Sequence, residues 1–241
     1  MPYSSWRGMV GVIKPTRRPG SLEELVRMLP DGIGVLPLML DIRAGTLEEF
    51  RAAIPRYEAM VADLAGDGAD LIVCCGAPPF MLLGPEGEAR LVRRWERRYR
   101  TPIRTHPMIH VAALRAVGAR SFVGASYSAL QNEIAVRYMG EAGFAIADMK
   151  PLDVPFHEVG RLSPETVYAH IKRMFLAAGG ADAVYLQGGG WRIASIIEPL
   201  ERDLGVPVVH AVAADCWHIQ RHLRVRAPRA GYGRLLAELP G

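Results

Sequence analysis

The sequence predicts an α/β fold with two similar Rossmann-like half-domains, each built on a parallel sheet, and an active site in the cleft between them. Apolar runs of strand length alternate with helical patterns along the chain, which is typical of parallel sheets with right-handed crossovers. A weak internal repeat, offset by 105 residues, supports two halves. It pairs Trp95-Glu96-Arg97 and Pro102-Ile103 with Leu200-Glu201-Arg202 and Pro207-Val208.

The repeat suggests a division into residues 1–118, residues 119–225 and a tail of residues 226–241, with part of the C-terminal segment completing the first half-domain. Each copy of the repeat follows a strand with an unusual end. Cys75-Gly76 ends the first strand and Gly188-Gly189 ends the second. Because ligands bind at the carboxyl ends of parallel strands, we expect these two loops to face one cleft.

Composition excludes several classes of protein. With 241 residues and 50% hydrophobic content, the chain can bury a large core. The net charge of +4 comes from scattered arginines, so we expect no nucleic-acid partner, while an anionic substrate fits. Met1 to Arg7 has no apolar signal core and the apolar runs are too short to span a bilayer, so we expect no membrane partner. Three cysteines without disulfide or zinc spacing favour a reduced, cytoplasmic setting.

The expected elements of the first half-domain follow from periodicity and punctuation. Ser21-Leu-Glu-Glu24 has the spacing of a capping box, and Thr46 is expected to cap a long helix. The predicted strands are 8–13, 34–40, 71–75 and a short one after Pro102, and the predicted helices begin at 21, 47 (to about 64), 87 (to 100) and 106 (to 117).

The second half-domain repeats this alternation. Ser163-Pro164 places Ser at an N-cap and Pro at the first helical position. The predicted strands are 121–125, 145–149, 183–186 and 207–209, the predicted helices are 129–142, 163–178, 191–204 and 213–223, and 150–162 is expected to be irregular. In the tail, Gly231-Tyr232-Gly233 predicts a turn.

Cys75 is the candidate reactive group. It ends a buried strand and precedes Gly76-Ala77-Pro78-Pro79, which predicts a tight loop before a helix. At such a strand end a thiol meets backbone N–H groups and a helix N-terminus, which bind anions. The alternative is that Cys75 is an inert buried residue. Cys74 points to the other face and is expected in the core, and packing is also favoured for Cys216.

Four segments make the chain resemble the arylmalonate decarboxylases and their relatives, the maleate isomerases and the aspartate/glutamate racemases. They span nearly the whole chain in order. The first three are Gly11-Val-Ile-Lys-Pro15, Cys75-Gly76-Ala77, and Tyr127 with Asn132-Glu133. The fourth is Gly188-Gly189-Gly190, followed by Glu201-Arg202 and Gly205-Val-Pro-Val-Val209. In addition, the ending Arg229-Ala-Gly-Tyr-Gly-Arg-Leu235 is especially like the decarboxylases.

The resemblance implies an enzyme without a metal or an organic cofactor, acting on a small carboxylate through an enediolate-like intermediate. It implies Cys75 as the catalytic residue. The implied substrate-binding residues are Pro15, Thr16, Gly76, Ala77, Tyr127, Gly188, Gly189 and Gly190.

The chain departs from the family pattern in two places. Gly188 stands where the decarboxylases have their proton-donating cysteine, so Cys75 would protonate the opposite face of the intermediate. Gly76-Ala77 replaces the family's Thr-Ser, whose hydroxyls help to hold a carboxylate. That role would pass to the N–H groups of Gly76, Ala77, Gly189 and Gly190 and to the hydroxyl of Tyr127.

The leading hypothesis is therefore decarboxylation of an arylmalonate-type dicarboxylic acid, with Cys75 protonating the enediolate. One carboxylate would lie in an apolar pocket walled by Pro15, Val73, Leu186 and Trp191. The first alternative is isomerisation, either of maleate with Cys75 as nucleophile or by racemisation with His210 as a second acid. The second is a dicarboxylate-binding protein without turnover. The chain is expected to be a monomer or a small homo-oligomer.

Other polar residues are weaker candidates. Arg17, Arg18 or Arg192 could pair with a second carboxylate, although surface arginines are the ordinary case. His110 and His210 could act as a general acid or base, although structural histidines are commoner. No spacing of His, Asp and Cys signals a metal site.

Overall fold

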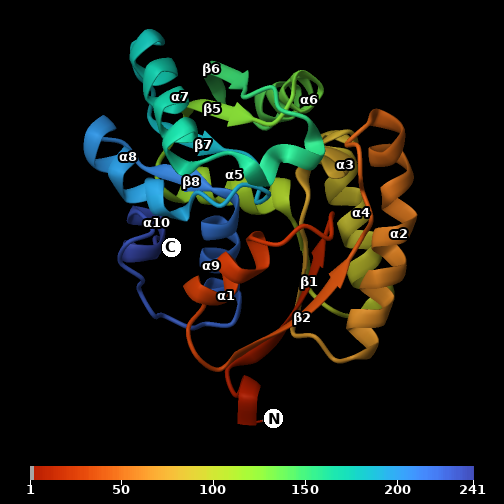
Figure 1. Cartoon of the computed structure of the whole chain (residues 1–241). Coiled ribbons are helices and arrows are strands. Elements are labelled where there is room, and N and C mark those ends of the chain that lie inside the picture. Colours follow the sequence, from red (N-terminus) through yellow and green to blue (C-terminus); the bar gives the residue numbers. More distant parts are fainter. Residues whose placement is uncertain (1–2) are drawn as a thin grey trace.

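The fold consists of two α/β halves, each with a four-stranded parallel sheet (Figure 1). The structure is a computed structural model and describes residues 3–241, so the first two residues of the segment Met1 to Arg7 lie outside the described part. The strands of the first sheet, in spatial order, are β2 (Ile33–Met39), β1 (Gly8–Lys14), β3 (Leu71–Cys74) and β4 (Ile103–Thr105). Those of the second are β6 (Ala145–Pro151), β5 (Ser121–Ser126), β7 (Ala183–Leu186) and β8 (Val208–His210).

The two sheets have the same strand order, and this confirms the predicted fold class. The repeat is visible in matching hydrogen bonds. Glu96 accepts the N–H of Ile103 at 3.1 Å, and Glu201 accepts that of Val208 at 2.9 Å. Each glutamate thus ties a helix to the start of the last strand of its sheet.

The helices lie on both faces of the sheets, as expected for parallel strands. They are α1 (Ser21–Met28), α2 (Leu47–Gly66), α3 (Ala77–Met81), α4 (Gly84–Tyr99), α5 (His106–Ala116), α6 (Ala129–Glu141), α7 (Pro164–Ala177), α8 (Ile197–Leu204), α9 (Ala211–His222) and α10 (Arg234–Glu238). Helix α9 follows the second sheet but packs beside α1 and α5 and against β3 (Figure 1). The proposed division of the chain at residues 118 and 225 stays a prediction. No helix within residues 3–241 is long and apolar enough to span a bilayer.

Several element boundaries differ from the sequence prediction. Helix α1 is capped at Gly20, whose N–H donates to Glu23 at 2.6 Å, because Glu23 rather than Glu24 is the third helical residue. Helix α3 begins directly at Ala77, since the prolines that follow need no N–H partner in a first turn. Helix α4 begins at Gly84 rather than at residue 87 for the same reason, with Pro85 in its first turn.

In the second half, the predicted helix 191–204 is shorter. Only α8 is helical, after a 3₁₀ turn at Ala194–Ile196, so the glycine-rich segment before it is an extended loop. Residues predicted as irregular include a 3₁₀ segment at Phe156–Arg161, and the turn at residues 231–233 leads into α10.

A buried carboxyl group links the two halves. Glu88 on α4 is fully buried and accepts hydrogen bonds from Thr105 at the end of β4 and from Tyr138 on α6. Burial raises the pKa of Glu88 to about 7, although both hydroxyl donors act in the opposite direction. The folded protein therefore binds this proton more tightly than the unfolded chain does.

This linkage predicts a pH-dependent stability. The stabilisation from protonated Glu88 is complete below the pKa of an ordinary glutamate and is lost as the pH rises to about 7. The shift corresponds to roughly 3 kcal/mol. In urea unfolding from pH 4.5 to 8, Glu88→Gln should remove this part of the decline. The exposed Glu86→Gln on the same helix is the matched control. Parallel curves for the wild type and Glu88→Gln would contradict the assignment.

Candidate active site

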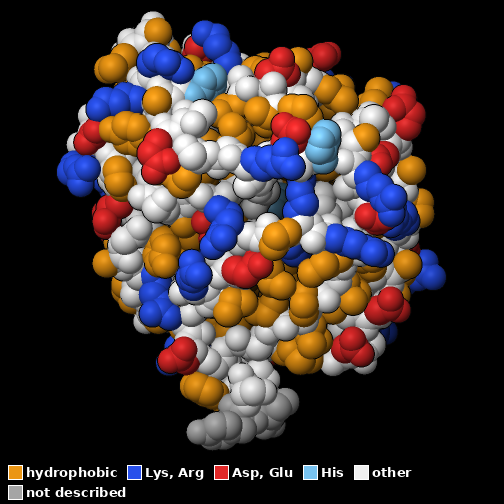
Figure 2. Space-filling view, viewed as in Figure 1, with side chains coloured by type: hydrophobic (Ala, Val, Ile, Leu, Met, Phe, Trp, Pro, Cys, Tyr) orange, Lys and Arg blue, Asp and Glu red, His pale blue; other side chains and the backbone are white. Residues whose placement is uncertain are grey.

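A pocket opens where the carboxyl ends of the two sheets meet, and residues of both halves line it. The empty space in it is about 860 Å³, which includes open solvent. Lys and Arg side chains gather around the hollow on this face of the molecule (Figure 2). All nine residues predicted for the site line it, namely Pro15, Thr16, Cys75, Gly76, Ala77, Tyr127, Gly188, Gly189 and Gly190. Their roles stay predictions.

The apolar wall differs from the one predicted. Val73, Leu186 and Trp191 do not line the pocket, because they are fully buried in the core, where Trp191 packs against the ring of Tyr127 at 4.8 Å. Pro15 is joined instead by Val12 of β1 and by side chains from loops and helices, which are Leu22, Leu25, Ile42, Phe50, Pro78, Pro79, Phe156 and Val212. Most strand side chains point to sheet faces that helices cover, so most of the lining comes from residues that follow the strands.

Cys75 lies at the base of the pocket, and only 7% of the residue is exposed. Its N–H donates to the carbonyl of Ile13 at 2.9 Å, which continues the pairing of β3 with β1 by one residue. Its Sγ lies 3.9 Å from Oδ2 of Asp215. Burial raises the pKa of the Cys75 thiol, an effect that His106 partly offsets and Asp215 reinforces. The side chain is therefore a thiol rather than a thiolate at neutral pH.

Two residues that the sequence reasoning missed complete this wall. His106 begins α5 and Asp215 lies on α9, and Nε2 of His106 is 2.8 Å from Oδ2 of Asp215. Both are buried, and Oδ1 of Asp215 has no partner among the described residues. The repeat carried a usable signal, since both helices directly follow the last strand of a sheet, and the start of α5 meets α9 at Asp215.

The imidazole of His106 is held from two sides. Its Nδ1 accepts the N–H of Gly76 at 3.1 Å, so the ring proton lies on Nε2, facing Asp215. Burial alone would lower the pKa of His106, but Asp215 and Cys75 raise it, and the net shift is well above the usual value. A second proton would have to sit on Nδ1, in place of the Gly76 contact.

Cys75, His106 and Asp215 are also the cluster whose ligand atoms could hold a metal ion, since those atoms lie within 4.8 Å of one another. Either a metal on Nε2 or a second proton on the imidazole would place hydrogen on Nδ1, where the N–H of Gly76 points.

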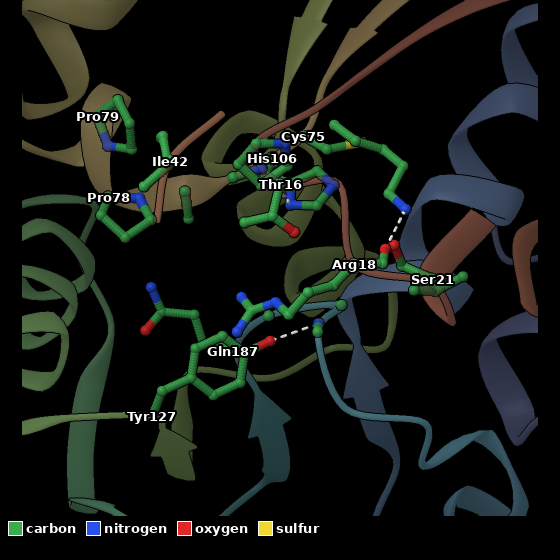
Figure 3. Close-up of a pocket in the computed structure, with 18 of the residues that line it drawn as sticks. Thr16, Arg18, Ser21, Ile42, Cys75, Pro78, Pro79, His106, Tyr127 and Gln187 are labelled. Carbon is green, nitrogen blue, oxygen red and sulfur yellow. Dashed lines mark hydrogen bonds between the residues drawn. The ribbon is translucent and has the colours of Figure 1, made fainter. Parts of the chain in front are cut away.

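Tyr127 closes the opposite side of the pocket, next to the glycine-rich loop. Its hydroxyl accepts the N–H of Gly190 at 2.5 Å (Figure 3). Gly188 has a φ of +104°, and a Cβ there would overlap the hydroxyl of Tyr127. The N–H groups of Gly76 and Gly190, both expected to bind a carboxylate, are thus already engaged within the protein.

Arg18 supplies the free positive charge of the pocket. Its guanidinium points toward Tyr127 (Figure 3) and lies 4.3 Å from the ring centre of Phe156. Its Nε and one Nη are buried without a partner among the described residues. Lys14 also lines the pocket but donates to the carbonyl of Arg18 at 2.7 Å. Arg17 is exposed beside Asp41, and Arg192 does not line the pocket.

The two histidines proposed as alternative acids or bases do not line the pocket, which corrects that expectation. His110 is fully buried, with Nδ1 2.7 Å from the hydroxyl of Tyr185. Burial lowers the pKa of His210 to about 3, so its imidazole is neutral at physiological pH. Both point into the core because they lie on faces of α5 and β8 that the other half covers.

The strand ends show which residues correspond between the halves. The N–H of Cys75 donates to the carbonyl of Ile13, and that of Gln187 donates to the carbonyl of Ala125 at 3.1 Å. The counterpart of Cys75 is therefore Gln187, and the counterpart of Gly188 is Gly76, which also has a positive φ, of 94°. Gln187 lines the pocket, and its amide cannot transfer a proton. Cys75 is the only cysteine among the residues that line the pocket.

Comparisons with known proteins agree with this architecture. The maleate isomerase of Pseudomonas putida S16 superposes with a TM-score of 0.89 at 20% identity, covering 96% of this chain and 99% of that one. A Nocardia farcinica maleate cis-trans isomerase with a covalently bound succinylcysteine intermediate gives 0.88 at 23%, covering 96% and 98%. A double mutant of arylmalonate decarboxylase in the liganded form gives 0.88 at 24%, covering 96% and 99%.

The two α/β halves, whose parallel sheets meet at a pocket lined by one cysteine, define the class of fold. The family model for arylmalonate decarboxylase matches residues 10–236, and the chain belongs to that family. The arylmalonate decarboxylase of Bordetella bronchiseptica is 27% identical over 235 residues, which are 95% of this chain and 96% of the relative. The predicted superfamily and the prediction of an enzyme are confirmed.

The close contact at Gly188 yields a prediction. Gly188→Ala should displace the Tyr127 side chain as well as strain the backbone, and so cost clearly more stability than Gly179→Ala. Gly179 also has a positive φ, of 74°, but open space around it, so its alanine variant should lose only about 1 kcal/mol. Urea unfolding of both variants measures the two losses of stability. The affinity of each variant for phenylsuccinate, a dicarboxylate probe, reports whether the displaced Tyr127 alters the pocket. Equal losses and unchanged affinity would show that Tyr127 need not occupy this position.

Proposed function

We propose that this protein is a cofactor-independent decarboxylase of arylmalonate-type dicarboxylic acids, with Cys75 as the proton donor. One observation carries the proposal: one thiol and the guanidinium of Arg18, whose buried Nε and one Nη have no hydrogen-bond partner among the described residues, face one pocket whose other walls are largely apolar. Membership of the arylmalonate decarboxylase family supports the reaction type. The roles of the predicted site residues are part of this proposal.

Arg18 and the Tyr127 loop would hold the carboxylate that becomes the enediolate. The guanidinium offers buried N–H donors beside the Tyr127 hydroxyl, and a charge-assisted pair in a buried site is strong. The leaving carboxylate would then lie against the wall formed by Pro15, Ile42 and Val12, where loss of hydration favours loss of CO₂. Thr16, Ala77 and Gly189 would complete the contacts to the substrate.

The state of Cys75 suits proton donation. Its buried thiol keeps its proton at neutral pH, so the S–H is ready when negative charge develops on the α-carbon. With Gln187 and Gly188 at the corresponding strand end, no second thiol faces Cys75 across the pocket among the lining residues. One-sided protonation would yield a single enantiomer from a prochiral malonate.

Isomerisation of a maleate-like acid is the second candidate. The contact between Sγ of Cys75 and Asp215 favours it, because a carboxylate next to a thiol can act as the base that creates a nucleophilic thiolate. Racemisation would need a second acid, and the proposed His210 does not reach the pocket. The oligomeric state and a cytoplasmic location stay predictions.

A pH-indicator assay with phenylmalonate, methyl-phenylmalonate and maleate tests the reaction. We expect proton uptake with CO₂ release from the malonates, a single enantiomer from methyl-phenylmalonate, and a loss of at least about 10³-fold in Cys75→Ala. Cys74→Ala, next in the chain but buried in the core, is the matched control.

Other outcomes assign the protein elsewhere. Fumarate formed from maleate without CO₂ would make it an isomerase. Turnover that survives Cys75→Ala would remove Cys75 from the chemistry. Thermal stabilisation by the three acids without conversion of any would identify a binding protein.

Arg18 should govern substrate affinity. Arg18→Met keeps the aliphatic length but removes the buried N–H donors, so KM for phenylmalonate should rise about 10- to 100-fold with a smaller change in kcat. Arg17→Met is the matched control, because Arg17 is exposed and lies 4.0 Å from Asp41. Equal KM values for the two variants would place the carboxylate elsewhere.

A further inference from the structure

We propose that Asp215 and His106 form a proton relay that returns a proton to the thiolate of Cys75 after each turnover, an inference that rests on the proposed function. Decarboxylation consumes one proton per turnover, and the thiol that supplies it is only 7% exposed. A buried thiolate formed in this way needs a nearby proton source. The structure places two titratable side chains there that the proposed chemistry does not otherwise use.

The three groups are in mutual contact. Oδ2 of Asp215 lies 3.9 Å from Sγ of Cys75 and 2.8 Å from Nε2 of His106, and His106 also contacts Cys75 directly. Oδ1 of Asp215 is buried without a described partner, although one face of the residue lines the pocket. A buried carboxylate with an unused oxygen is costly as a structural group, and its position beside a reactive thiol accounts for it.

The proton balance is as follows. The S–H of Cys75 gives its proton to the α-carbon, so the S–H bond breaks and a C–H bond forms. A proton held by the Asp215–His106 pair then moves through Oδ2 to Sγ, which restores the thiol and leaves Asp215 as carboxylate and His106 neutral. Water entering the pocket returns one proton to the pair, so each cycle takes up one proton and releases CO₂.

Protonation of the Asp215–His106 pair is coupled to the hydrogen bond that His106 accepts from the N–H of Gly76. A protonated His106 carries hydrogen on Nδ1 and can no longer accept the N–H of Gly76, which would turn to the pocket. A substrate carboxylate that accepts this N–H would thus favour the charged His106. The charged or titratable groups facing His106 are Asp215 from α9, Cys75 after β3, His110 from α5 and His210 from β8.

Rapid mixing with phenylmalonate separates a relay from a structural role. The first turnover uses the proton already on Cys75, whereas later turnovers need the relay. In Asp215→Asn, product should appear in a burst of one per active site at close to the wild-type rate, followed by a steady-state rate about 10²-fold lower. His106→Asn, which keeps an acceptor for the Gly76 N–H but loses the donor to Asp215, should behave in the same way.

His110→Gln is the control, because His110 is a buried histidine of the same helix that does not line the pocket. It should show no burst and a wild-type steady state. If Asp215→Asn slows the first and later turnovers equally, or neither, the relay is wrong while the proposed function stands. If the wild type releases no CO₂, the proposed function itself fails.

The second measurement does not depend on turnover. The ¹⁵N shifts of the His106 imidazole, assigned with His106→Asn, follow the hydrogen on Nδ1 as the pH changes. Saturation with phenylsuccinate, a dicarboxylate that is not a malonate, should move the loss of this hydrogen to a higher pH than in the free protein. A titration that this probe leaves unchanged would overturn the coupling to Gly76 and the relay with it.

Discussion

The buried hydrogen bond between His106 and Asp215 constrains much of this protein. Both side chains are nearly inaccessible to water, and a buried carboxylate is tolerated only when it is paired. The pair joins the first turn of α5 to α9, although the two residues are 109 positions apart in the sequence. It therefore fixes where α9 packs on the first sheet, and it places a titratable oxygen beside Cys75. Packing and chemistry here rest on the same contact.

The likeness of the two halves explains why the site forms at this edge. The residue that follows β3 donates its backbone N–H to β1, and the residue that follows β7 donates to β5 in the same way. In each half the next residue is a glycine with positive φ. The chain thereby turns sharply at both strand ends, and each turn presents one side chain to the pocket. The first half presents a thiol and the second an amide, since Cys75 and Gln187 occupy equivalent places. The two halves are alike in fold, but at these equivalent places only the first half presents a thiol to the pocket.

Local patterns predicted the fold and much of the pocket. Alternating strands and helices, and the glutamates of the repeat, gave the two sheets, and the glycine-rich strand ends pointed to the residues that line the cleft. The apolar wall was wrong at Val73, Leu186 and Trp191, because periodicity does not reveal which face of a strand the helices cover. His106 and Asp215 were missed because they are 109 residues apart and meet only through the packing of α5 on α9.

The engaged N–H groups bear on how a substrate would enter. The N–H groups of Gly76 and Gly190 are hydrogen-bonded to His106 and Tyr127, so their burial costs little free energy while the pocket holds no anion. A carboxylate can reach them only by displacing those partners. The Nε and one Nη of Arg18 have no hydrogen-bond partner among the described residues, so under the proposed function this guanidinium would bind an incoming anion first. Affinity would then reside in Arg18, and the exchange of hydrogen bonds at Gly76 would link substrate binding to the protonation of the pair beside the thiol.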